Sequence, residues 1–212
     1  EQAVFFLQEA VDRWSENRKE PDFAPAIPGL MLLQAQYQES LNWFSRAYLS
    51  YRKIFTMFPA QEVARQAKRS MDQLTKTFAL FPPALMENEL NRRIKRLLKS
   101  AMHKEALEEL TAFRKRSGNK ALPPQWYFDL ASAYNGLRER PKVVETLKKF
   151  MKAYPGHSRQ QQARFTIGKA LWNIGKNNDA RNYFSKILNS TSKTKWKITA
   201  GYYLARVLED DK

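Results

Sequence analysis

Residues 143–150 read Val-Val-Glu-Thr-Leu-Lys-Lys-Phe, and three apolar members of this stretch recur at a fixed interval. Val143, Leu147 and Phe150 follow one such triplet by 37 residues and precede another by 37. The flanking triplets are Ala106, Leu110 and Phe113, and Ala180, Phe184 and Ile187. A period of this length is typical of stacked two-helix units, none of which buries its apolar face alone. The sequence therefore predicts an all-α solenoid in which neighbouring repeats share one extended core.

A second apolar series keeps the same register one helix earlier. Its members are Leu97, Tyr134, Leu171 and Leu208, and the small residues Ala131, Gly168 and Ala205 precede the last three by three positions. A small residue at this point lets two antiparallel helices approach closely. Each unit is thus predicted to consist of a helix A, a short turn and a helix B.

Two full repeats and half of another share one residue pattern. The matching residues are Leu130, Ala131, Tyr134, Val143, Leu147 and Pro155; then Ile167, Gly168, Leu171, Gly175, Ala180 and Phe184; and upstream Ala47, Tyr51, Ile54 and Pro59. This pattern resembles the tetratricopeptide repeat family. The resemblance implies a right-handed superhelix of antiparallel helix pairs. It says almost nothing about activity, because one fold serves many functions.

The charge balance is the strongest compositional signal. The 212 residues include 37 Lys and Arg against 21 Asp and Glu, a net charge of +16, and no Cys. This excess favours an anionic partner such as nucleic acid, an anionic lipid surface or the carboxylate-bearing peptides of a cell wall, and a solvated surface without a fixed partner is the alternative. The absence of Cys excludes disulfides and thiolate metal sites. No apolar stretch approaches the roughly 20 residues of a membrane span.

The chain is interpreted as one solenoid over residues 1–212, and as an excerpt of a longer protein with a further C-terminal domain. Loops are predicted near 20–28, 79–84 and 117–124, where Pro or Gly interrupts the helical pattern. A helical stretch over 29–58 is expected to break near 41–44. An additional helix over 60–78 explains why 59 residues separate Ala47 from Ala106. Ser158 and Gln161 are expected to form a capping box.

Helix A lines the inner surface of such a superhelix, so its residues outside the apolar series are candidate ligand contacts. The candidate inner-groove contacts are Asn91, Lys95, Phe128, Ser132, Asn135, Phe165, Lys169, Trp172, Tyr202 and Arg206. Aromatic faces beside cations suit sugar rings, peptides or stacked bases. Packing of the same aromatic rings against a neighbouring helix is the alternative interpretation.

Catalytic, cofactor and metal sites find no support in the sequence. His103 and His157 are the two histidines, and neither pairs with a nucleophile at a known spacing. Two histidines without Cys make a zinc site improbable, and no Gly-rich phosphate loop is present. We expect no catalytic residue, no cofactor and no metal in this chain.

A narrower pattern links three segments. They are Phe58-Pro59, the stretch from Asn91 to Leu107, and Ala200-Gly201-Tyr202-Tyr203-Leu204-Ala205-Arg206-Val207-Leu208-Glu209. Together they resemble the superhelical, non-catalytic domain of soluble lytic murein transglycosylases. The resemblance implies a periplasmic protein that acts on peptidoglycan through a lysozyme-like domain elsewhere in the molecule. Glu39-Ser40 lies downstream of Gly29-Leu30-Met31-Leu32, the reverse of the family's catalytic order, so no catalytic residue is carried over.

Three functional hypotheses follow from these observations. The first is a periplasmic scaffold that binds anionic cell-wall strands and positions an enzyme domain. The second is a periplasmic or cytoplasmic adaptor that holds an acidic or extended protein segment in its inner groove. The third, less favoured, is binding of nucleic acid through its backbone charge.

Overall fold

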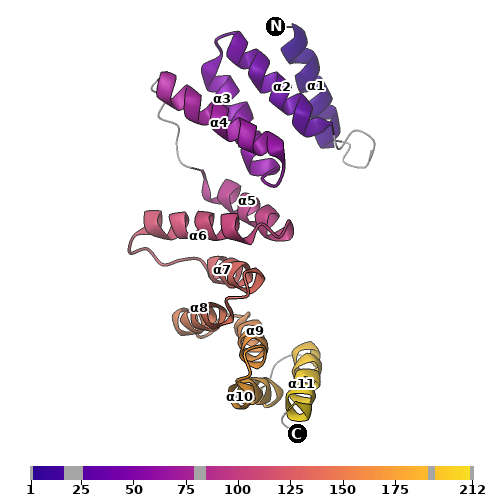
Figure 1. The fold of residues 1–212 in the computed structure, drawn as a ribbon, viewed down its shortest axis with the longest axis vertical. Coiled ribbons are helices and arrows are strands. Elements are labelled where there is room, and N and C mark those ends of the chain that lie inside the picture. The colour runs from indigo at the N-terminus through magenta and orange to yellow at the C-terminus, as the bar shows by residue number, and fades with distance from the viewer. Residues whose placement is uncertain (1, 17–25, 79–84, 191–193, 211–212) are drawn as a thin grey trace. The chain divides into compact units, whose positions relative to one another are not determined.

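The computed structural model describes residues 2–16, 26–78, 85–190 and 194–210, and throughout these ranges the chain forms helices joined by short turns, without a strand (Figure 1). The helices are α1 (Gln2–Glu16), α2 (Ile27–Ser40), α3 (Phe44–Met57), α4 (Glu62–Thr77), α5 (Glu87–Lys99), α6 (His103–Ser117), α7 (Pro124–Gly136), α8 (Arg140–Ala153), α9 (Gln160–Trp172), α10 (Asn177–Leu188) and α11 (Thr194–Glu209). The all-α fold predicted from the repeat period is confirmed.

The apolar triplets form the buried stripes of α6, α8 and α10. Eight of their nine residues are buried, and Phe113 is half-buried. Burial of each large apolar side chain stabilises the fold by about 1.5–3 kcal/mol. The 37-residue period therefore marks the core itself.

The same period is visible in the backbone. The turns between helices A and B contain Ala101, Arg138 and Gly175, each 37 residues apart, and their φ angles are 57°, 61° and 74°. Asn42, in the turn between α2 and α3, has φ 60° and lies 59 residues before Ala101. That offset equals the one between Ala47 and Ala106 in the sequence. Each of these four turns thus uses one residue in the left-handed region, although only one of the four residues is Gly.

The contacts divide the chain into unit 1 (Glu1–Ser100) and unit 2 (Ala101–Lys212). In unit 1, α1 packs on α2, α2 on α3, and α3 on both α4 and α5. The centre of this unit is formed by the fully buried Tyr51, Ile54 and Ala67. The phenol of Tyr51 donates a hydrogen bond to Glu39 at 2.7 Å, so the buried hydroxyl is satisfied. The single solenoid over residues 1–212 stays a prediction.

In unit 2 each helix from α6 to α11 packs on the next one along the chain, and α9 also packs on α11. Its buried core runs from Phe128 to Val207. Gly168 of α9 lies directly against the ring of Phe184 of α10, and a Cβ on this glycine would be 2.8 Å from Cε1 of that ring. In the α9/α10 hairpin, the two helices therefore approach closely at Gly168, as predicted for the small residue of helix A.

The predicted helix breaks agree with the structure, with small shifts. The break near 41–44 lies between Ser40 and Phe44, and α4 provides the additional helix with Ala67, Met71 and Leu74 buried. The loop near 117–124 is confirmed between the end of α6 and the start of α7. α2 begins at Ile27, inside the stretch 20–28 that was predicted as a loop. Residues 20–25 of that stretch and the loop at 79–84 lie outside the described residues.

One local prediction was wrong, and α11 differs from the other helices A. Ser158 does not cap α9, because Arg159 is the N-cap residue and its backbone N–H donates to Nδ1 of His157 at 3.1 Å. In α11, Ala205 and Leu208 are exposed, Leu208 by 43%, while Ala200 and Val207 are buried. The equivalent α9 residues, Gly168 and Leu171, are buried on the side that packs against α10. The described residues of unit 2 place no such helix B against α11.

Candidate functional site

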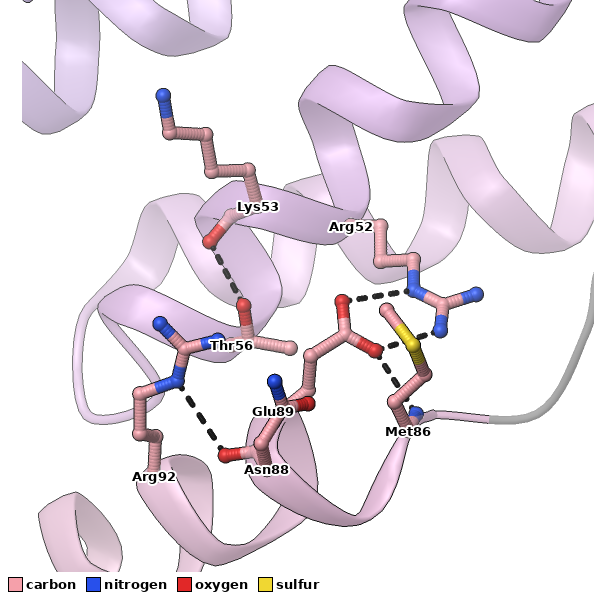
Figure 2. Close-up of polar contacts among 7 residues, drawn as sticks. All are labelled: Arg52, Lys53, Thr56, Met86, Asn88, Glu89 and Arg92. Carbon is pink, nitrogen blue, oxygen red and sulfur yellow. Dashed lines mark hydrogen bonds and ion pairs between the residues drawn. The ribbon is translucent and has the colours of Figure 1, made fainter.

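The candidate groove residues of unit 1 lie on α5, whose opposite side is fixed to α3. Asn91 is half-buried and Lys95 is exposed. Figure 2 shows the contact that sets the position of α5: Arg52 of α3 holds the carboxylate of Glu89, with Nη2 2.6 Å and Nε 3.2 Å from its oxygens. Their side chains are only 6% and 17% exposed. The hydrogen bonds from Arg52 lower the pKa of Glu89, and the bond to Glu89 raises the pKa of Arg52.

Two arginines of α5 also have structural roles. Arg93 donates to the carbonyl oxygen of Phe55 at 2.7 Å and stacks on the Phe55 ring with 3.6 Å between its guanidinium carbon and the ring centre. Arg96 donates to the carbonyl of Thr56 at 3.2 Å. Both carbonyls belong to the last turn of α3, where a helix leaves carbonyl groups without internal partners and favours cations. These arginines therefore attach α5 to the end of α3.

On α7, the three predicted contacts have different surroundings. Phe128 is 9% exposed; its ring lies 4.8 Å from that of Phe150 and 3.5 Å from the guanidinium carbon of Arg159. It is part of the core, so the expectation that it faces a ligand is wrong. Ser132 and Asn135 are exposed. Asn135 accepts hydrogen bonds from Arg140 at its backbone carbonyl and its side-chain oxygen.

Arg159 joins α7 to the start of α9. Its Nη1 donates to Gln125 of α7 at 2.8 Å, and Gln125 donates to the buried carboxylate of Asp129 at 2.7 Å. Burial lowers the pKa of Arg159, and the charge of Asp129 opposes that shift. This network covers Phe128 with a cation, which the sequence pattern did not reveal because the residues come from two repeats.

The predicted residues of α9 meet α11. The half-buried Phe165 packs on Tyr203 at 5.1 Å between ring centres, so helix packing accounts for this ring. Lys169 is exposed, with its Nζ 5.3 Å from the centre of the Tyr203 ring. The Trp172 ring lies 5.6 Å from Tyr203, and its indole N–H donates to Asp210 at 2.6 Å. Tyr203, absent from the predicted set, is the centre of this group.

Two further predicted contacts extend the group along α11. Tyr202 is 60% exposed and its ring lies 5.4 Å from Tyr203. Arg206 is exposed, with its Nε 3.8 Å from Glu209. We call this surface the α9/α11 face, and it consists of Lys169, Trp172, Tyr202, Tyr203 and Arg206. Aromatic rings next to cations bind planar and anionic groups through stacking, cation–π attraction and charge-assisted hydrogen bonds.

The histidines take part in packing. The ring of His157 lies 5.5 Å from Phe150 and its Nδ1 accepts the Arg159 N–H bond. His103 is half-buried and its ring lies so close to Gly136 that a Cβ there would be 2.2 Å from it. Neither is a simple surface residue. In the part of the chain that the structure describes, no group of three or more His, Cys, Asp or Glu could hold a metal ion, and no helix is long and apolar enough to cross a membrane.

No family model and no curated protein matches the chain. Among solved structures, a tetratricopeptide repeat protein from Parabacteroides merdae ATCC 43184 is similar. The alignment covers 98% of this chain and 90% of that protein, at 12% sequence identity and a TM-score of 0.42.

Proposed function

We propose that the chain is a helical-repeat adaptor whose unit 2 binds an acidic, extended polypeptide segment across the α9/α11 face. The observation that carries the proposal is the placement of Lys169 and Arg206 beside the rings of Trp172, Tyr202 and Tyr203 on adjacent helices. Ammonium and guanidinium groups supply donors for carboxylates, and the rings supply apolar area for the peptide between them.

The distribution of charge supports the same unit. Residues 101–212 contain 22 Lys and Arg against 10 Asp and Glu, whereas residues 1–100 contain 15 against 11. Most of the net charge therefore belongs to the unit that bears the α9/α11 face. A field of this sign raises the rate at which an acidic partner meets the protein.

The face already holds carboxylates of its own chain. Asp210 accepts the hydrogen bond of the Trp172 indole, and Glu209 lies next to Arg206. A carboxylate is thus a good fit to these donors in geometry and charge. An acidic segment of a partner would use the same donors, and it would compete with Asp210 for the indole.

A periplasmic scaffold of a lytic transglycosylase is the second candidate. The exposed Tyr202 and the half-buried Trp172 favour it, because aromatic rings stack on sugar rings and the cations suit the carboxylates of wall peptides. Under this proposal the protein is periplasmic and works with an enzyme domain. The adaptor proposal is compatible with a periplasmic or a cytoplasmic location.

The test is a binding series with a fluorescent peptide of alternating Glu and Phe residues, purified peptidoglycan, and RNA as a competitor. Lys169→Glu with Arg206→Glu should weaken peptide binding by at least tenfold, which corresponds to about 1.4 kcal/mol. Lys148→Glu with Lys152→Glu, two exposed positions of α8, makes the same charge change away from the face and should retain most of the affinity.

The outcomes separate the candidates. Equal losses in the two double variants would refute the α9/α11 face as the binding site. Retention on peptidoglycan that depends on Lys169 and Arg206, without peptide binding, would favour the wall scaffold. Binding that RNA abolishes for every variant would indicate a response to overall charge.

A further inference from the structure

A pocket of about 210 Å³ opens between α7 and α8, and it lies outside the α9/α11 face. Its α7 wall is largely aromatic and its α8 wall carries charged side chains. The lining residues are Trp126, Tyr127, Leu130 and Tyr134 of α7, and Lys142, Glu145, Thr146 and Lys149 of α8. The volume is below the roughly 300–1,000 Å³ of pockets for drug-sized ligands, so it suits a single side chain.

The next repeat fills the equivalent position with its own ring. Tyr183 of α10 lies 37 residues after Thr146, and its half-buried ring packs against the core of unit 2. Lys186, which is 37 residues after Lys149, has its Nζ 5.9 Å from the centre of that ring. The pKa of Tyr183 is raised first by burial and then by the charge of Asp179, and the charge of Arg164 opposes the rise.

The residues of the α9/α10 hairpin that correspond to the pocket lining differ from it in charge. Asp179 of α10 is the counterpart of Lys142, and Arg164 of α9 is the counterpart of Tyr127. At this position the α9/α10 hairpin carries an aromatic side chain of its own, which is half-buried against the core of unit 2. Between α7 and α8 the corresponding residue is Thr146, which is too small to occupy the same space.

Lys142, which lines the pocket, stands where the next repeat has Asp179, so the charge at this position is reversed. Lys142 is exposed and pairs with Glu139, and its Nζ lies 5.2 Å from the Tyr134 ring. Lys149 pairs with Glu145 at 2.7 Å. The pocket lining thus contains two lysines and one carboxylate, so it is positive overall and favours an anionic group.

We propose that the pocket between α7 and α8 binds one aromatic side chain of a partner polypeptide, with a negative group at the outer end of the ring near Lys142. The ring takes the position that Tyr183 takes one repeat later, with Lys149 over its face. A phosphorylated tyrosine and a chain-terminal Phe or Tyr with a free carboxylate both supply this chemistry. The proposal stands independently of the peptide site on the α9/α11 face.

The first experiment uses phenyl phosphate as the probe, with benzyl alcohol and inorganic phosphate for comparison, and follows the indole signal of Trp126 by NMR. Phenyl phosphate should bind at least about fivefold more tightly than either comparison compound. Lys142→Asp should remove the preference over benzyl alcohol. Equal binding of phenyl phosphate and inorganic phosphate, or shifts that spare Trp126, would overturn the proposal.

The second experiment fills the pocket between α7 and α8 by substitution, and creates an equivalent pocket between α9 and α10. Thr146→Tyr should abolish binding by supplying the ring from within, as Tyr183 does, whereas Thr111→Tyr, an exposed position of α6, should bind normally. Tyr183→Thr should create a second site, which keeps the proposal testable if Thr146→Tyr does not fold. Unchanged binding by a folded Thr146→Tyr, or a single site in Tyr183→Thr, would refute it.

The third experiment identifies the source of the anion. Pentapeptides that contain phosphotyrosine, or that end in Phe with a free carboxylate, are compared with their unphosphorylated and amidated forms. Binding of either charged peptide supports the proposal and identifies its source. Binding of phenyl phosphate without binding of either peptide would overturn the assignment to a polypeptide side chain.

Discussion

Replacement of Gly168 by Ala tests whether close helix contact at this residue holds α9 against α10. The new Cβ would be 2.8 Å from Cε1 and 3.0 Å from Cζ of Phe184. Carbon atoms in good contact lie about 3.5–4.0 Å apart, so the ring would have to move by about 0.5–1 Å. Phe184 is fully buried, and the rings of Phe165 and Tyr203 lie 5.9 and 5.8 Å from it. The surrounding core therefore resists the movement.

Two opposing effects set the size of the change. Gly→Ala within a helix is favourable by about 1 kcal/mol, because the helix loses less backbone entropy on folding. Overpacking of a core costs about 1–3 kcal/mol. We expect Gly168→Ala to lower the free energy of unfolding by up to about 2 kcal/mol, the difference between these two effects. Gly201→Ala of α11 is the matched control, because its new Cβ comes no closer than 3.8 Å to Leu188 and should raise stability by up to about 1 kcal/mol.

Urea unfolding of the whole chain, followed by far-ultraviolet circular dichroism and Trp fluorescence, measures both changes. The double variant Gly168→Ala with Phe184→Leu should be more stable than the sum of the two single changes predicts, because the smaller side chain removes the clash. The reasoning fails if Gly168→Ala is as stable as Gly201→Ala, or if the two substitutions in the double variant are additive.

Three further predictions concern the ion pair between Arg52 of α3 and Glu89 of α5, the left-handed turn residues, and the aromatic rings of α7 and α9. Glu89→Gln should cost unit 1 about 2–3 kcal/mol in urea unfolding, because the buried Arg52 loses its counter-charge. Since the folded pKa of Glu89 is lowered, its contribution is present above the unfolded pKa and is lost as pH falls through the folded value, so the variant should show a weaker loss of stability in acid. Arg138→Gly should raise the free energy of unfolding, measured by thermal unfolding, by about 0.5–1 kcal/mol, because it removes a side chain from a residue in the left-handed region. Gly175→Ala should lower the free energy of unfolding by about the same amount. A gain in both variants would contradict the turn geometry. Phe128→Ala should lower the free energy of unfolding by about 3–4 kcal/mol, because it removes a buried ring. Trp172→Ala should mainly weaken binding of the acidic peptide in the fluorescence assay. If Phe128→Ala instead weakened binding and Trp172→Ala lowered stability, the binding site would be on α7 rather than on α9.

Much of the candidate site depended on contacts between repeats that a periodic pattern does not describe. Phe128 and Phe165 occupy equivalent positions in sequence, yet Phe128 is buried under Arg159 and Phe165 packs on Tyr203. Arg52 of α3 and Glu89 of α5 lie on two helices that the additional helix α4 separates in sequence, so the repeat pattern does not indicate their ion pair. Arg93 of α5 is buried against Phe55 of α3, a contact between two helices that the periodic pattern does not describe.

The amino-acid sequence by itself determined the helical hairpins, their 37-residue period and the residues that form the buried stripes. It could do so because helix amphipathicity and turn chemistry act over a few neighbouring residues and repeat with them. Only the tertiary structure decided which side chains remain accessible. Tyr183 of α10 is half-buried against the core, whereas its counterpart Thr146 of α8 lines an open pocket. Ala205 of α11 is exposed, whereas the equivalent Gly168 of α9 is covered by Phe184. Accessibility depends on which neighbouring helix covers a residue, and that is a property of packing across repeats.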